Sequence, residues 1–252
     1  MPLIQSVQRA LQIVDLFDER TPELKITEIS ARMQLHKSTV HSLLKTLMHH
    51  GYIAQDDESG KYRLGLALVE KGNMLLQSMD LRSIAKPYIA ELSAKSGQTT
   101  HLVVLDGRDG VYIDKVEGAK AAIRYSRIGR RVPLHSSAVG KALAAFRPLE
   151  ALHALLDDYT FDKRTERTIG DREAFLAELT RVRGCGFAID DEENEPGVRC
   201  AAAPIFDHSG VAAAAISVST MTSSVDDDAL RALIDELLEA AKAISRQLGY
   251  KG

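Results

Sequence analysis

The sequence contains few cysteines, and this excludes two classes of small scaffold. Only Cys185 and Cys200 occur among the 252 residues, fifteen positions apart and without a Cys-x-x-Cys pair. Neither a disulfide framework nor a zinc ribbon fits that number and spacing. We therefore expect reduced thiols, as in a cytosol. No metal site and no cofactor is indicated.

Long apolar runs are also missing. No segment approaches the roughly 20 apolar residues of a membrane span, and the N-terminus lacks the basic and apolar segments of a signal peptide. We expect a soluble, cytoplasmic protein. The formal net charge of −3 argues against a uniformly basic surface, so any contact with nucleic acid must be local.

The length and composition favour two domains, because 252 residues with 45% hydrophobic content can bury two modest cores. Residues 26–50 predict two short helices joined by a tight turn. Ile26, Ile29 and Met33 recur at helical spacing, and an apolar stripe resumes after a polar break. Ser30 allows the helices to approach, and Gln34 occupies the turn. This spacing is typical of a helix-turn-helix.

The outward face of the second helix has no acidic residue from position 36 to position 50. Lysines and hydroxyls at a helix start can contact phosphates, together with the free amides of its first turn. His41 and Ser42 could reach base edges. An ordinary hairpin with a solvated face is the alternative. The candidate DNA-binding residues on this helix are His36, Lys37, Ser38, Thr39, His41, Ser42 and Lys45.

A β-hairpin is predicted next, with strands at 52–55 and 61–64 around a polar turn. Lys61 and Arg63 are two positions apart and share one face of the second strand, so both can lie along a phosphate backbone. Ser6 is expected to cap a preceding helix that packs onto the pair. Residues 1–65 thus predict a winged helix-turn-helix DNA-binding domain.

The rest of the chain predicts a linker helix at 66–79 and an α+β domain at 80–252. That second domain alternates short apolar runs with amphipathic segments. Strands are expected at 99–105, 111–116, 122–125, 187–190, 198–206 and 211–219. Helices are expected at 138–145, 149–156, 172–183 and 226–248.

A small-molecule site is predicted at the start of the helix at 138–145. His135, Ser136 and Ser137 come directly before it, and the unpaired amides of Ala138 and Val139 would attract a carboxylate. The small residues Ala138 and Gly140 are expected to leave room for the ligand. A plain serine N-cap is the alternative. On the later strands, Val198 shares a face with Cys200, and Ser217 with Ser219.

Three more specific kinds of site do not fit the residues: a phosphate-binding loop, a calcium loop and a catalytic cysteine. The string AVGKA lacks the upstream glycine of a phosphate-binding loop, and Ala142 replaces the required Ser or Thr. The acidic residues at 190–195 lack the spacing of a calcium loop. A Cys200 nucleophile with His135 as base is conceivable, but buried thiols are usually inert. An enzyme acting on a small organic acid therefore remains only as an alternative.

The strings ITEISARMQLHKSTVHSLLKTL, GKYRLG, RIGRRVPLHSSAVGKALAA, DDEENEPGVRC, AAPIFD and AAISVS follow one another along nearly the whole chain. In this order they resemble the isocitrate lyase regulator (IclR) family of bacterial transcription factors. YSRIGRRVPLHSSAVGK, FDKRTERTI and ISRQLGY most resemble the repressors of 2-keto-3-deoxygluconate and of pectin or hexuronate catabolism.

The resemblance implies a winged-helix domain, a linker helix and a GAF-like domain that binds a small organic acid. It also implies a homodimer or a dimer of dimers on a double-stranded DNA operator. In the family, the effector pocket is lined at the positions of Asp190, Cys200, Ser217 and Ser219. Ser42 stands where relatives commonly carry Arg, so we expect a different operator.

We therefore expect a repressor that is released from DNA by a keto acid such as 2-keto-3-deoxygluconate. An activator, or a regulator answering to an aromatic acid, glyoxylate or pyruvate, is the alternative within the class.

Overall fold

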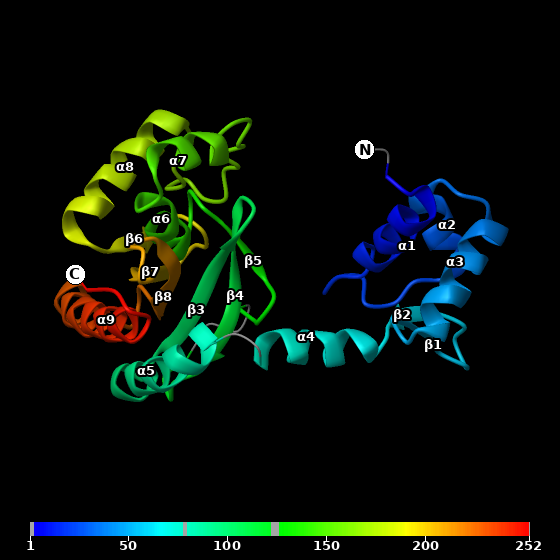
Figure 1. The fold of residues 1–252 in the computed structure, drawn as a ribbon, viewed down its shortest axis with the longest axis horizontal. Coiled ribbons are helices and arrows are strands. Elements are labelled where there is room, and N and C mark those ends of the chain that lie inside the picture. The colour runs from blue at the N-terminus through cyan, green and yellow to red at the C-terminus, as the bar shows by residue number, and fades with distance from the viewer. Residues whose placement is uncertain (1–2, 78–79, 122–125, 252) are drawn as a thin grey trace. The chain divides into compact units, whose positions relative to one another are not determined.

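The computed structural model describes residues 3–77, 80–121 and 126–251 (Figure 1). The chain divides into two compact units, Met1–Ser78 and Met79–Gly252. The described residues form nine helices and eight strands. The predicted class, a winged helix-turn-helix followed by an α+β domain, is confirmed. The strand predicted at 122–125 lies outside the described residues, and the domain limits 1–65, 66–79 and 80–252 stay predictions.

The first unit packs three helices, α1 (Gln5–Asp15), α2 (Ile26–Met33) and α3 (Lys37–His49), around one small core. The predicted cap at Ser6 is wrong, because α1 already begins at Gln5 and has Ile4 at its N-cap position. Helical spacing brings the apolar residues to the inside. The core residues are Ile13, Phe17, Leu24, Ile29, Val40, Leu44, Ile53 and Tyr62.

The turn between α2 and α3 depends on two residues. Gln34 adopts a left-handed conformation, with φ 54° and ψ 39°, and so reverses the chain within a single residue. The Ser30 hydroxyl donates a hydrogen bond of 2.5 Å to the Leu35 carbonyl. This bond closes the turn and fixes the start of α3.

The wing consists of β1 (Ile53–Gln55) and β2 (Tyr62–Leu64), which pair antiparallel with Ala54 opposite Arg63. Leu24 adds an isolated bridge to Tyr62, so the segment before α2 is tied to the wing. The helix α4 (Ala67–Gln77) follows.

The second unit is built on one antiparallel sheet in the order β5-β4-β3-β8-β7-β6. The sequence did not predict β5, because it has only three residues and pairs with β4 alone. The strands are β3 (Thr99–Asp106), β4 (Asp109–Val116), β5 (Arg131–Pro133), β6 (Ala188–Asp191), β7 (Val198–Phe206) and β8 (Ala212–Met221).

Helices cover both faces of this sheet (Figure 1). On one side α5 (Asp80–Ser96) packs beside α9 (Asp227–Gln247), and on the other lie α6 (Ala138–Ala145), α7 (Leu149–Leu155) and α8 (Arg172–Cys185). The helix α8 runs past the predicted end at 183, because a helix interior tolerates Gly184 and the left-handed cap is Gly186, with φ 82°.

Candidate functional site

The outward face of α3 is a continuous polar surface without acidic side chains. Val40 and Leu44 are 0% and 1% exposed, and their burial fixes the rotation of the helix about its axis. All seven residues predicted for DNA contact on this helix are exposed: His36, Lys37, Ser38, Thr39, His41, Ser42 and Lys45.

The start of α3 can accept a phosphate. His36 at the N-cap position makes no side-chain capping bond, and the first amides of a helix have no partner within the helix. Further along, the Ser42 hydroxyl donates to the Ser38 carbonyl at 3.1 Å. With its proton engaged in this bond, the hydroxyl oxygen is left as a hydrogen-bond acceptor.

The two basic residues of the wing, Lys61 and Arg63, differ in their surroundings. The ammonium group of Lys61 lies 3.5 Å from the Glu23 carboxylate, an exposed pair that a phosphate could displace at little cost. Arg63 is exposed on β2. Whether these residues contact DNA stays a prediction.

In the second unit, a small cavity lies between the start of α6 and the sheet. Its volume is about 20 Å³, which is space for about one water molecule. Strand pairing assembles its polar wall, since His101 is opposite Ser217, Ser219 opposite Cys200 and Cys200 opposite Asp190. We call it the α6 cavity; its wall comprises His101, Tyr112, Ser126, Ser137, Ala138, Val139, Asp190, Asn194, Cys200, Ser217 and Ser219.

His101 is the centre of this wall. Its Nε2 lies 2.8 Å from the Ser126 hydroxyl, and its Nδ1 lies 3.4 Å and 3.5 Å from the hydroxyls of Ser217 and Ser219. Burial lowers the pKa of His101 to about 3, so the ring is neutral at physiological pH. The wall offers several hydroxyl and ring nitrogen groups, and none of its described lining residues is a lysine or an arginine.

Asp190 closes the cavity at the edge of the sheet. Its carboxylate accepts hydrogen bonds from the amides of Glu193 at 2.8 Å and Asn194 at 3.1 Å. Burial nevertheless raises its pKa to about 7. Burial also raises the pKa of the neighbouring Cys200 thiol, which keeps that thiol protonated and makes it a poor nucleophile.

The start of α6 forms one side of the cavity. The Ser137 hydroxyl accepts from the Gly140 amide at 3.1 Å and donates to the Pro133 carbonyl at 2.6 Å. The amides of Ala138 and Val139 lie in the first turn of α6, where a helix provides no backbone carbonyl for them. Gly140 does not leave room for one, contrary to our expectation. A Cβ there would lie 2.5 Å from the Pro133 carbonyl oxygen, so this glycine serves close backbone packing.

The structure brings together seven of the predicted effector residues and separates four. Ser137, Ala138, Val139, Asp190, Cys200, Ser217 and Ser219 line the α6 cavity, whereas His135, Ser136, Gly140 and Val198 do not. His135 is held elsewhere, because its Nδ1 lies 2.9 Å from the Tyr159 hydroxyl and its Nε2 lies 3.1 Å from the Asp162 carbonyl. Effector binding by any of the eleven stays a prediction.

Four wall residues were not predicted: His101, Tyr112, Ser126 and Asn194. A histidine inside the apolar run at 99–105 was the available signal. Ser136 reaches the cavity indirectly, since its hydroxyl donates to the Asn194 side-chain oxygen at 3.1 Å.

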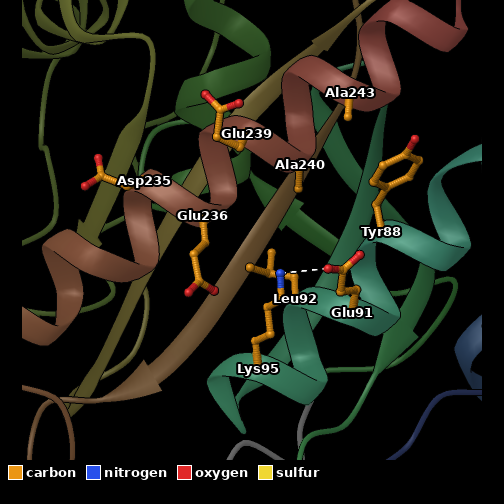
Figure 2. Close-up of a pocket in the computed structure, with 9 residues that line it drawn as sticks. All are labelled: Tyr88, Glu91, Leu92, Lys95, Asp235, Glu236, Glu239, Ala240 and Ala243. Atoms are coloured by element: carbon orange, nitrogen blue, oxygen red, sulfur yellow. Dashed lines mark ion pairs between the residues drawn. The ribbon is translucent and has the colours of Figure 1, made fainter.

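A wider groove of about 490 Å³ lies between α5 and α9. Figure 2 shows four carboxylates around it, Glu91, Asp235, Glu236 and Glu239, and one ion pair between Glu91 and Lys95. Its charge repels an organic acid. Among the residues that the structure describes, no group of three or more His, Cys, Asp or Glu could hold a metal ion, and no helix is long and apolar enough to cross a membrane.

Comparison with known proteins covers both units. Residues 6–57 match the IclR helix-turn-helix domain, and residues 73–246 match the bacterial transcriptional regulator IclR C-terminal family. The chain is 55% identical over 250 residues to the HTH-type transcriptional regulator XynR of Escherichia coli K12, with 99% of each covered. It is 42% identical over 247 residues to KdgR of Dickeya chrysanthemi, covering 98% of this chain and 81% of that relative.

The fold has solved counterparts as well. The crystal structure of the Thermotoga maritima IclR aligns with a TM-score of 0.79 at 32% identity, covering 98% of this chain and 99% of the other.

Proposed function

Because this chain belongs to the IclR family of bacterial transcriptional regulators, we propose that it represses a sugar-acid catabolic operon. It is a DNA-binding regulator rather than an enzyme. Its similarity to XynR and KdgR supports the repressor role. The inducer is a small keto acid such as 2-keto-3-deoxygluconate, and the protein acts in the cytoplasm.

The α6 cavity is the observation that carries the effector proposal. The amides of Ala138 and Val139 suit a carboxylate at the helix start, and the His101, Ser217 and Ser219 groups opposite suit the hydroxyls and keto oxygen of a sugar acid. A volume of about 20 Å³ is too small for a six-carbon acid, so its walls have to move apart. The ligand binds more tightly to the protein conformation that has weak affinity for DNA, and so shifts the population toward that conformation.

A homodimer fits the first unit. Ile4 at the N-cap position of α1 and Val7 and Leu11 within it are 71%, 53% and 60% exposed. They form an apolar stripe that a second copy would cover. A dimer presents two recognition helices to two half-sites. Val7→Glu is expected to lower the mass measured by light scattering and to weaken operator binding. An unchanged mass would exclude α1 as the dimer contact.

The effector proposal is tested by thermal unfolding of the full chain with 2-keto-3-deoxygluconate, glyoxylate, pyruvate, gluconate and protocatechuate. A ligand at a hundred times its dissociation constant adds about 2.7 kcal/mol of stability. We expect stabilisation by the first compound, release of operator DNA at the same concentrations, and loss of both in Ser217→Ala. Stabilisation by another acid alone would overturn the assignment of a sugar acid as the inducer. It would leave the function as a transcriptional regulator unaffected.

A further inference from the structure

A second hollow in the second unit is lined by aromatic rings and by basic side chains. It lies where β7, α6 and α9 end, has a volume of about 670 Å³, and shares no lining residue with the α6 cavity. Cavities of about 300 to 1,000 Å³ are the usual size of small-molecule sites. We call it the aromatic hollow and define it by Phe146, Phe206, Tyr250, Lys242, Arg246 and Lys251.

Three rings form its apolar wall. Phe146 and Phe206 meet edge to face with centroids 5.1 Å apart, and Phe206 stacks on Tyr250 at 4.9 Å with an interplanar angle of 29°. All three rings are only half-buried. They therefore offer apolar surface to a further planar group.

The backbone holds these rings in place. The Phe206 amide donates to the Ser245 hydroxyl at 2.9 Å, and the Tyr250 amide donates to the Ser245 carbonyl at 3.0 Å. Gly249 takes the left-handed conformation, with φ 87°, that such a helix ending requires. The end of α9 thus fixes Tyr250 beside Phe206, and the wall is already formed before any ligand arrives.

The rim is cationic. Lys242, Arg246 and Lys251 line the hollow, and none of its described lining residues is acidic. Lys242 pairs with Glu239 at 2.9 Å. For Arg246 and Lys251 no ion pair occurs within the part of the chain that the structure describes. The groove on the other side of α9 carries the opposite charge (Figure 2), so of these two hollows beside α9 the aromatic one attracts an anion.

We propose that the aromatic hollow is a second ligand site, distinct from the α6 cavity, and that it binds a small planar aromatic anion. The ring of the ligand packs against Phe206 and Tyr250, and its negative group faces Arg246 and Lys251. Charge complementarity and the ring wall together select this class over neutral aromatics and over aliphatic acids.

The test is calorimetric titration of the full chain with 1-naphthoate, with neutral 1-naphthalenemethanol as the matched probe. We expect saturable binding of naphthoate and at least tenfold weaker binding of the alcohol. Arg246→Gln and Tyr250→Leu should each weaken naphthoate binding at least tenfold. Lys163→Gln, which alters an exposed pair with Glu166, and Ser217→Ala, in the α6 cavity, should leave it unchanged.

Three results would overturn the proposal. One is the absence of saturable binding to a protein whose circular dichroism is that of the folded chain. Another is binding that is lost in Ser217→Ala and retained in Arg246→Gln, which would assign the naphthoate to the α6 cavity. The third is a change of oligomeric mass in Tyr250→Leu, measured by light scattering, which would make the hollow an interface between copies of this chain.

Discussion

Lys141 and Glu193 form an ion pair inside the second unit, with 2.6 Å between Nζ and Oε1. Lys141 is 1% exposed, and it also lies 3.4 Å from the Glu178 carboxylate. The pair ties α6 to the segment after β6, in which Asn194 lines the α6 cavity. The position of that segment therefore depends on a buried charge.

Replacing Lys141 by Met should lower the free energy of unfolding by about 3 to 5 kcal/mol, because Glu193 would remain buried without its partner. Urea unfolding measures the change. The double variant Lys141→Met, Glu193→Leu should recover most of the loss, since it removes both charges. A loss below about 1 kcal/mol in the single variant would contradict this account.

Stability should depend on pH through Asp190. Its pKa is raised from 3.8 to about 7 by burial, so the folded protein holds this proton more tightly than the unfolded chain does. The contribution is fully present below about pH 4 and is lost as the pH rises to about 7.

The measurement is urea unfolding at pH 5 and pH 8. Asp190→Asn keeps an oxygen for the amides of Glu193 and Asn194 but cannot ionise. Between these pH values wild type should lose about 2 to 3 kcal/mol relative to the variant, at 1.36 kcal/mol per pKa unit. Parallel pH profiles would show that Asp190 ionises normally.

Phosphate contacts can be separated from base contacts by salt dependence. Lys37→Ala and Arg63→Ala should each weaken binding to every DNA sequence and reduce the slope of log affinity against log salt by about 1. Fluorescence anisotropy at several salt concentrations measures both. Lys163→Ala, in the other unit, is the control, and an unchanged slope in the test variants would exclude them as phosphate contacts.

His41 should behave differently, because it lies in the middle of the exposed surface of α3 and is predicted to reach a base edge. His41→Ala should change which sequence is selected from a randomised operator pool and leave the salt slope unaltered. If wild type and variant select the same sequence, His41 reads no base.

Gln34 is strained by its left-handed backbone, which costs a non-glycine residue roughly 1 to 2 kcal/mol. Gln34→Gly should stabilise the first unit by up to about 1 kcal/mol, since the added chain entropy of glycine offsets part of the gain. The rate of hydrogen exchange of the α2 and α3 amides measures this change in stability. Ala31→Gly, inside α2, should have the opposite effect. Faster exchange in Gln34→Gly would show that the glutamine side chain stabilises the turn.

Local patterns predicted the regular elements well. The helix at 138–145 and the strand at 198–206 have the predicted bounds, because continuous apolar runs with clear ends specify them. The wall of the α6 cavity was predicted only in part, since four of its eleven described residues were missed. His101 and Ser217 meet through strand pairing across more than a hundred residues, and periodicity within one strand does not reveal which strand lies beside it.

Gly140 shows a second limit. Its small size is visible in the sequence, but the backbone of Pro133 and Leu134 that fills the space is not. His135 likewise has the right chemistry for a ligand and the wrong position, since it packs against Tyr159 and Phe161. In both cases the residue type suggested a place in the effector site. The packing around the residue shows that it has a structural role instead.

Ser217 and Ser219 alternate along β8 with Ile216 and Val218, which are buried and point to the opposite face of the sheet. A change at 217 or 219 alters the wall of the α6 cavity and leaves Ile216 and Val218 in place behind the strand. If the α6 cavity binds the inducer as proposed, single substitutions at these two positions in a duplicated gene would change the inducer while the core on the far side of the sheet stayed the same.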